Sequence, residues 1–172
     1  MEGNVEMEFW AKTKIIEQVF LENPYHAQVV ANDFWPILGQ SSRVVFSVSD
    51  MLVLKLDARG QNRNEAIVGL YKTAWPAIAR VYDVGYDAIW LTQERVQYNR
   101  EWYWERDVEG SVQKALLNQS TPYGKAWEKA IRFILEPGKK SYKRKIAMGE
   151  ALYPTQWGFR GDVPVLFDLG IN

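Results

Sequence analysis

The sequence predicts an α+β protein, with an antiparallel sheet and one helix followed by a mainly helical region that ends in a hairpin. Strand-like segments and turn signals follow one another between residues 35 and 96 in the order β-β-β-α-β-β. Apolar residues recur at helical spacing on both sides of that section, and a short apolar run at 163–167 lies near the end. We therefore expect a helical extension at 1–34, a sheet region at 35–96, and a helical region with a terminal hairpin at 97–172.

The composition fits one globular domain and excludes several other classes. The 172 residues are enough to bury a sizeable core. The formal net charge is zero, so no overall electrostatic attraction to nucleic acid or to a membrane surface is expected. The chain has no cysteine, no signal-peptide pattern at its acidic start, and no apolar run near the roughly 18 residues that span a bilayer. We expect a cytoplasmic protein without a membrane span.

The beginning of the chain predicts two helices that pack on the rest. Apolar residues between positions 9 and 22 recur close to helical spacing. Asn23 precedes Pro24, and a residue before proline is disfavoured in the α-helical region, so the first helix should end there. A second, shorter helix is predicted at 25–34.

Two strands are predicted next, at 44–48 and 51–56, after a short strand end and a small-residue turn. Side chains alternate between the two faces of a strand. Lys55 therefore shares a face with Val53, and Leu54 points to the other face. A lysine on an otherwise apolar strand needs an anionic partner or a route to water. An edge-strand lysine whose ammonium reaches solvent also satisfies this pattern.

A helix at 64–74 and two further strands complete the sheet region. Glu65 falls in the first turn of that predicted helix, where the helix dipole alone accounts for a carboxylate. Strands are predicted at 78–82 and 88–92, with Gly85 in the loop between them. The buried stripe of the helix is expected to consist of Ala66, Ile67, Leu70 and Tyr71.

The second half is predicted to be mainly helical, with helices at 98–118 and 120–135. The aromatic run at 102–104 is interpreted as packing, because no basic residues interleave it as in a nucleic-acid platform. The basic cluster at 139–145 is interpreted as a solvated helix face, with an acidic or phosphate-bearing partner as the alternative.

The closing segment allows two interpretations. A turn at 154–158 and an apolar run at 163–167 predict a hairpin, and the run ends in Asp168 with Gly170 two residues later. An acid on such a turn can hold a metal–phosphate group. On these residues alone a plain chain reversal is favoured.

Taken together, the order of these segments resembles the protein-kinase-like superfamily over residues 35–172. The resembling features are a glycine turn between strands, a strand lysine, a helix glutamate, two more strands and a terminal Asp-x-Gly. The match is closest to small kinase-like proteins of bacteria and their phages. The resemblance implies a compact, truncated kinase-like fold, with a five-stranded lobe at 35–96 and a reduced helical lobe at 97–172.

The resemblance also implies a site for ATP and Mg²⁺. Lys55 matches the lysine that holds the phosphates, and Glu65 matches the glutamate that pairs with it. Asp168 matches the metal-binding acid, and Gln156 takes the place of the second metal ligand. The remaining implied nucleotide-binding positions are Gly39, Ser41 and Ser42 in the phosphate-covering turn, Val53 against the adenine, and Glu94 and Val96 in the hinge.

The departures from the kinase pattern concern catalysis. Ala151 occupies the position of the catalytic base, and a methyl group cannot accept a proton. Glu150 is one residue away and can substitute if the loop register slips. The chain as given stops two residues after Gly170, which leaves no segment for a protein-substrate platform.

Three functions remain open from the sequence. The favoured one is a pseudokinase that regulates a protein partner, such as a host protein if the chain is phage-encoded, with or without bound nucleotide. The second is an active, atypical phosphotransferase or nucleotidyltransferase that uses Glu150 or Asp162 as its base. The third is an α+β interaction module whose resemblance to kinases is accidental.

Overall fold

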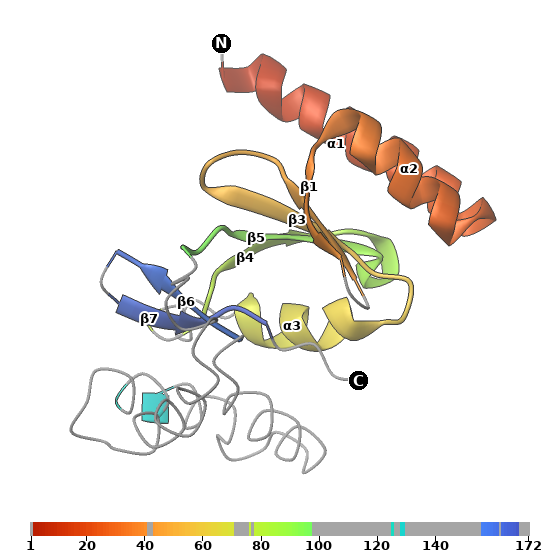
Figure 1. The fold of residues 1–172 in the computed structure, drawn as a ribbon. Coiled ribbons are helices and arrows are strands. Elements are labelled where there is room, and N and C mark those ends of the chain that lie inside the picture. The colour runs from red at the N-terminus through yellow and green to blue at the C-terminus, as the bar shows by residue number, and fades with distance from the viewer. Residues whose placement is uncertain are drawn as a thin grey trace. The chain divides into compact units, whose positions relative to one another are not determined.

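The computed structural model describes residues 2–40, 43–70, 76, 78–97, 125, 128–129, 156–161 and 163–168. These residues belong to two compact units. The first unit consists of Met1–Ala66 and Val81–Glu94, and the second consists of Ile67–Arg80 and Arg95–Asn172. The protein is a mixed α+β structure, as predicted (Figure 1).

The first unit begins with two helices, α1 (Glu2–Glu22) and α2 (Pro24–Phe34). Asn23 separates them in an extended conformation, with φ −155° and ψ 105°. Its side-chain oxygen accepts hydrogen bonds from the backbone N–H groups of Tyr25 (3.0 Å) and His26 (3.2 Å). The cap satisfies helix donors that otherwise lack a partner, and it confirms the predicted break before Pro24.

A five-stranded antiparallel sheet follows, with strand order β1-β2-β3-β5-β4. Helix α3 (Gln61–Gly69) comes between the third and fourth strands, so the predicted order β-β-β-α-β-β is confirmed. The strands are β1 (Ile37–Gln40), β2 (Val44–Ser47), β3 (Leu52–Leu56), β4 (Val81–Val84) and β5 (Trp90–Glu94).

The sheet carries different chemistry on its two faces. Leu54 and Leu56 pack into an apolar core with residues of α1 and α2, whereas Lys55 contacts a residue of α3. This is the face assignment that strand alternation predicts. Figure 1 shows α1 and α2 over one face of the sheet and α3 against the other. The buried members of the apolar core are Ile16, Ala27, Ala31, Trp35, Val44, Phe46, Leu54, Leu56, Ile89 and Trp90.

Helix α3 begins at Gln61, three residues earlier than predicted. The Asp57 carboxylate accepts hydrogen bonds from the backbone N–H groups of Arg59 (2.7 Å) and Asn62 (2.6 Å), while Gly60 adopts a left-handed φ of +82°. This turn starts the helix ahead of the predicted bound at residue 64. Glu65 therefore lies beyond the first turn, and the helix-dipole explanation for it is wrong.

The predicted buried stripe of α3 is only partly correct. Ala66 is buried as predicted, whereas Leu70 follows the helix as a turn residue and is exposed. The side chains of Ile67 and Tyr71 lie outside the described residues.

Strands β4 and β5 begin three and two residues later than predicted, at Val81 and Trp90. Asp87 and Ala88 both have a left-handed backbone, with φ 51° and 56°, so Ala88 belongs to the turn and not to the strand. Gly85 lies tightly against Trp90, because a Cβ atom at this position would be 2.2 Å from the indole nitrogen. The width of this turn explains the later start of β5, which follows it.

In the second unit, β6 (Trp157–Arg160) and β7 (Val163–Leu166) form the predicted closing hairpin. Gly161, at φ +59°, lies between the two strands. The turn predicted at 154–158 is wrong in its second half, because Trp157 and Gly158 are strand residues. Of the predicted second-half helices, the structure describes only Lys125, Glu128 and Lys129, which are helical. The aromatic run at 102–104 and the basic cluster at 139–145 lie outside the described residues.

Within the described part of the chain, no helix combines the length and the apolarity that crossing a membrane requires.

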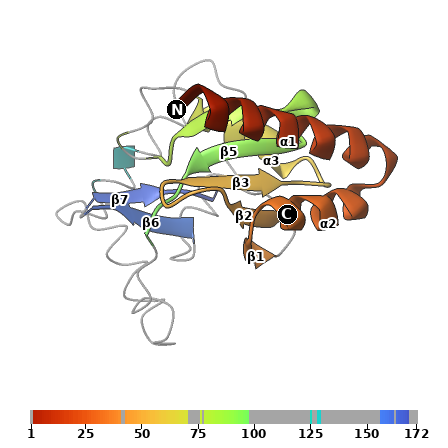
Figure 2. The same ribbon diagram turned by 90° about the horizontal axis from the view of Figure 1, so that it is seen from above.

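Glu17 connects α1 to the start of β5 and to the turn before that strand. Its Oε1 atom accepts hydrogen bonds from the indole Nε1 of Trp90 and from the backbone N–H of Tyr86, both at 2.9 Å (Figure 2 shows α1 along the sheet). Its Oε2 atom accepts from Lys14 at 2.7 Å. Burial raises the pKa of the Glu17 carboxyl, but the three hydrogen bonds together outweigh it and lower the pKa below the usual value of 4.5.

We predict that Glu17→Gln lowers the free energy of unfolding by about 1 kcal/mol at neutral pH, because charge-assisted hydrogen bonds become neutral ones. The folded pKa is lowered, so the contribution of the charge is present above pH 4.5 and is lost as the pH falls through the folded pKa. Urea denaturation should therefore show a smaller difference between wild type and variant below pH 4.5. Glu22→Gln, at an exposed position of the same helix, should show no such difference at any pH.

Candidate functional site

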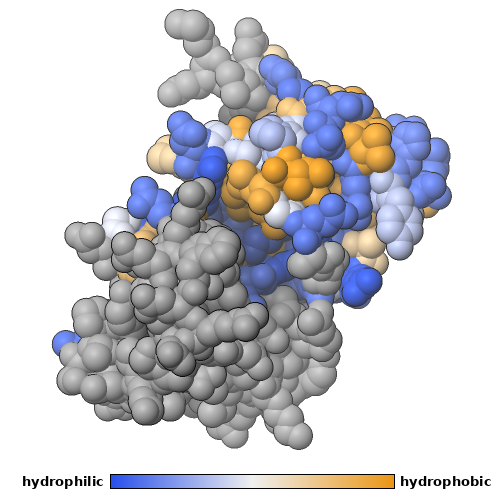
Figure 3. Space-filling model, viewed as in Figure 1, coloured by the Kyte–Doolittle hydropathy of each residue, from blue (hydrophilic) through white to orange (hydrophobic). Residues whose placement is uncertain are grey.

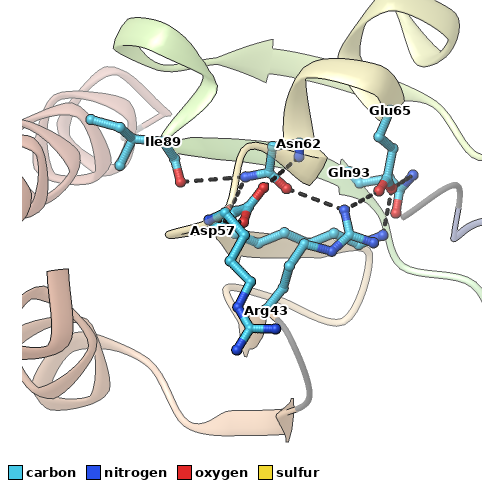
Figure 4. A network of polar contacts seen from close by, with 8 residues as sticks. Arg43, Asp57, Asn62, Glu65, Ile89 and Gln93 are labelled. Atoms are coloured by element: carbon cyan, nitrogen blue, oxygen red, sulfur yellow. Dashed lines mark hydrogen bonds and ion pairs between the residues drawn. The ribbon is translucent and has the colours of Figure 1, made fainter. Parts of the chain in front are cut away.

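The buried carboxylate of Glu65, on α3, accepts hydrogen bonds from three polar side chains of the first unit. Glu65 is 0% exposed. Its Oε1 atom accepts hydrogen bonds from Lys55 Nζ and from Gln93 Nε2, the latter at 2.6 Å. Its Oε2 atom accepts from a guanidinium nitrogen of Arg43 (Figure 4). Three donors from three separate segments therefore converge on one carboxylate.

The sheet register determines which side chains reach Glu65. β3 pairs with β5 so that Val53 lies opposite Gln93 and Lys55 lies opposite Leu91. Lys55 and Gln93 therefore point to the same face, two positions apart on adjacent strands. Arg43 immediately precedes β2, the strand on the other side of β3. A shift of one residue in any of these strands would turn its donor to the opposite face.

Asn62 connects the beginning of α3 to the same cluster. Its side-chain nitrogen donates to the backbone oxygens of Lys55 (3.0 Å) and Ile89 (3.3 Å), and its side-chain oxygen accepts from Arg43 (3.2 Å). Asn62 is 0% exposed, so each of these bonds is made away from bulk water. The side chain therefore joins α3 to β3 and to the residue before β5, as Figure 4 shows.

The charges within the cluster compensate one another. Arg43, Lys55 and Asp57 are 5%, 3% and 3% exposed, and a buried charge without a partner costs several kcal/mol. Glu65 compensates the two cations, while the Asp57 carboxylate accepts from backbone N–H groups. Removing Glu65 would leave two buried cations without this anion. The most direct consequence of the arrangement is to fix α3 against the sheet.

The structure brings together two of the residues predicted to bind nucleotide, Lys55 and Glu65, as a buried ion pair. Val53 is buried in the same strand, two residues before Lys55. The snorkelling interpretation of Lys55 is wrong, because its side chain is buried in an internal strand. Other predicted positions lie elsewhere in the chain: Gly39 is exposed in the edge strand β1, Glu94 ends β5, Val96 follows it partly buried, and Ser41 and Ser42 are outside the described residues.

The second unit brings together the two residues predicted to bind metal. The backbone oxygen of Gln156 accepts hydrogen bonds from the N–H groups of Phe167 (2.9 Å) and Asp168 (3.4 Å). The open end of the β6–β7 hairpin therefore places Gln156 and Asp168 side by side along the backbone. Within the described residues, no group of three or more His, Asp or Glu side chains gathers as a metal site. Ala151, Glu150 and Asp162 lie outside the described residues.

Sequence reasoning missed three members of the cluster: Arg43, Asn62 and Gln93. Neither Arg43 nor Asn62 is among the site residues expected from the sequence. Gln93 directly follows an apolar strand pattern, and a polar side chain in line with Lys55 on the neighbouring strand was an available signal. That signal depends on the register, which the sequence does not specify.

No protein-family model, curated protein or solved structure matches the chain. The kinase resemblance expected from the sequence therefore stays a prediction.

We predict that Glu65→Ala lowers the free energy of unfolding by about 3–5 kcal/mol, because two buried cations lose their shared anion. Urea denaturation followed by circular dichroism measures the change. The control is Arg63→Ala on the same helix, α3. It removes an ion pair with Asp87, and the side chains of both residues are 57% exposed. It should cost no more than about 0.5 kcal/mol. Equal losses in the two variants would contradict the importance of the buried cluster.

Proposed function

We propose that this chain is a kinase-like protein that does not transfer phosphate and instead regulates another protein by binding it. The observation that supports the proposal most is the ion pair between Lys55 and Glu65. It joins the third strand of a five-stranded antiparallel sheet to the helix that precedes the fourth strand. This is the pairing that the kinase resemblance implies.

The absence of phosphotransfer is inferred from the sequence of the catalytic-loop segment. Ala151 stands where kinases have the base that orients the attacking hydroxyl group. Gln156 stands where they have an asparagine as the second metal ligand, and both side chains offer an amide oxygen to Mg²⁺. The inference therefore depends on Ala151, because this change removes the proton acceptor.

The residues that could hold ATP and Mg²⁺ fit that role only in part. Asp168 and Gln156 lie together and could share a cation, which would neutralise phosphate charge. The Lys55 side chain, however, is 3% exposed and bonded to Glu65, which already accepts from Arg43 and Gln93. Little of the ammonium surface remains for a phosphate group. We therefore assign the pair a structural role in fixing α3 to the sheet.

The exposed apolar surface of the helical extension supports a protein as the partner. Leu21 on α1 is 69% exposed, and Tyr25 and Val29 on α2 are 77% and 63% exposed. Tyr25 and Val29 are one helical turn apart on α2, and large apolar side chains exposed side by side favour contact with another macromolecule. A nucleotide site in the sheet does not require these exposed side chains on α1 and α2.

We predict that the purified chain transfers no label from γ-labelled Mg-ATP to itself or to general protein substrates, because no base accepts the hydroxyl proton. The reaction is followed by autoradiography beside an active kinase. Two variants accompany the wild type. Asp168→Asn removes the implied metal ligand, and Asp33→Asn is a matched change at an exposed position on α2.

Label that appears with wild type and Asp33→Asn but disappears with Asp168→Asn would overturn the proposal. It would favour the active phosphotransferase that uses Glu150 or Asp162. Isothermal titration of the same three proteins with Mg-ATP shows separately whether nucleotide binds without transfer.

A further inference from the structure

The exposed face of α2 is apolar at its start and acidic at its end. Tyr25, Val29 and Asp33 follow one another at intervals of four residues, which places them on one side of the helix. Tyr25 and Val29 are 77% and 63% exposed, and Asp33 is exposed as well. The opposite side of α2 carries the buried Ala27 and Ala31. Figure 3 shows apolar residues in orange beside hydrophilic residues in blue where α2 lies in the view of Figure 1.

The helical extension is acidic, although the whole chain is neutral. Residues 1–34 contain six acids, two lysines and no arginine, which gives a net charge of −4. Both lysines lie on α1 and form ion pairs with glutamates of the same helix, Lys12 with Glu8 and Lys14 with Glu17. α2 contains neither lysine nor arginine. A segment that docks on α2 therefore meets negative charge, which favours a basic segment.

Two of these acids lie where helix stability favours cations. Glu22 is the last residue of α1, and Asp33 is the last but one of α2. The C-terminal end of a helix carries a partial negative charge, so a carboxylate there is unfavourable and a lysine or arginine is favourable. Neither helix has a basic residue in its last turn. The two carboxylates therefore do not stabilise the helices that carry them, whereas a cationic group supplied by a partner would reduce both repulsions.

We propose that α2 and the end of α1 form a docking surface for a basic, amphipathic segment of a partner protein. Apolar side chains of that segment contact Tyr25 and Val29, and its lysines or arginines pair with Glu22 and Asp33. This inference rests on the proposed function, because it specifies the chemistry of the protein that is regulated. Exposed ion pairs contribute little each, so apolar contact supplies most of the affinity and the two acids determine the charge of the partner.

Fluorescence anisotropy of a labelled amphipathic helical peptide of leucine and lysine, titrated with the full chain, tests this inference. The comparison peptide has glutamate in place of each lysine. The wild type should bind the lysine peptide about tenfold more tightly or better, and added salt should reduce the difference. Val29→Ser, Glu22→Lys and Asp33→Lys should each weaken binding of the lysine peptide by about threefold or more. Asp50→Lys, at an exposed position between β2 and β3, is the control with the same change of net charge and should bind like wild type.

The two lysine substitutions at the helix ends are favoured by the helix dipole, so lost binding does not reflect unfolding, and circular dichroism melts check this. Three results would overturn the inference: no binding of the lysine peptide, equal binding of both peptides, or an equal loss in Asp50→Lys and Asp33→Lys. Sedimentation equilibrium of the chain alone adds a fourth, because a dimer that Val29→Ser dissociates would assign the surface to a second copy. Failure of peptide binding leaves the absence of phosphotransfer standing, whereas label transfer from Mg-ATP would overturn the proposed function and leave the peptide result standing.

Discussion

The buried carboxylate of Glu65 is the interaction on which the arrangement of the first unit depends. It is 0% exposed and accepts from donors that come from the segment before β2, from β3 and from β5. Three neighbouring strands thus meet one helix at one point. A carboxylate in this position is tolerated only because its partners are already in place, so the sheet register and the position of α3 determine each other.

The two faces of the sheet are stabilised by different physics. On one face α1 and α2 bury an aromatic and aliphatic core, whose stability comes from apolar area removed from water and has no preferred direction. On the other face α3 is fixed by directional, charged contacts that fail if the geometry changes. Lys55 is one of these contacts, because it forms an ion pair with Glu65 on α3. Under the proposed function, a residue pair used elsewhere for phosphate binding serves here to orient a helix.

The sequence was sufficient for the order of the sheet elements but not for the details of the site. Alternation correctly placed Leu54 on one face of β3 and Lys55 on the other, because a strand has a fixed period of two. The start of α3 was missed because the Asp57 turn uses side-chain acceptors that no periodicity reveals. Arg43 and Gln93 were missed as partners of Glu65, because their convergence depends on pairing between strands distant in sequence.

Arg43 and Lys55 together compensate the buried carboxylate of Glu65, and a double-mutant cycle measures their shared dependence on it directly. Arg43→Met and Lys55→Met each leave Glu65 with one cation, whereas the double variant leaves a buried carboxylate with none. We predict that urea denaturation shows the double variant to be destabilised beyond the sum of the single variants by about 1–3 kcal/mol. Additivity within about 0.5 kcal/mol would contradict this prediction, because it would mean that the two cations stabilise the protein independently of each other.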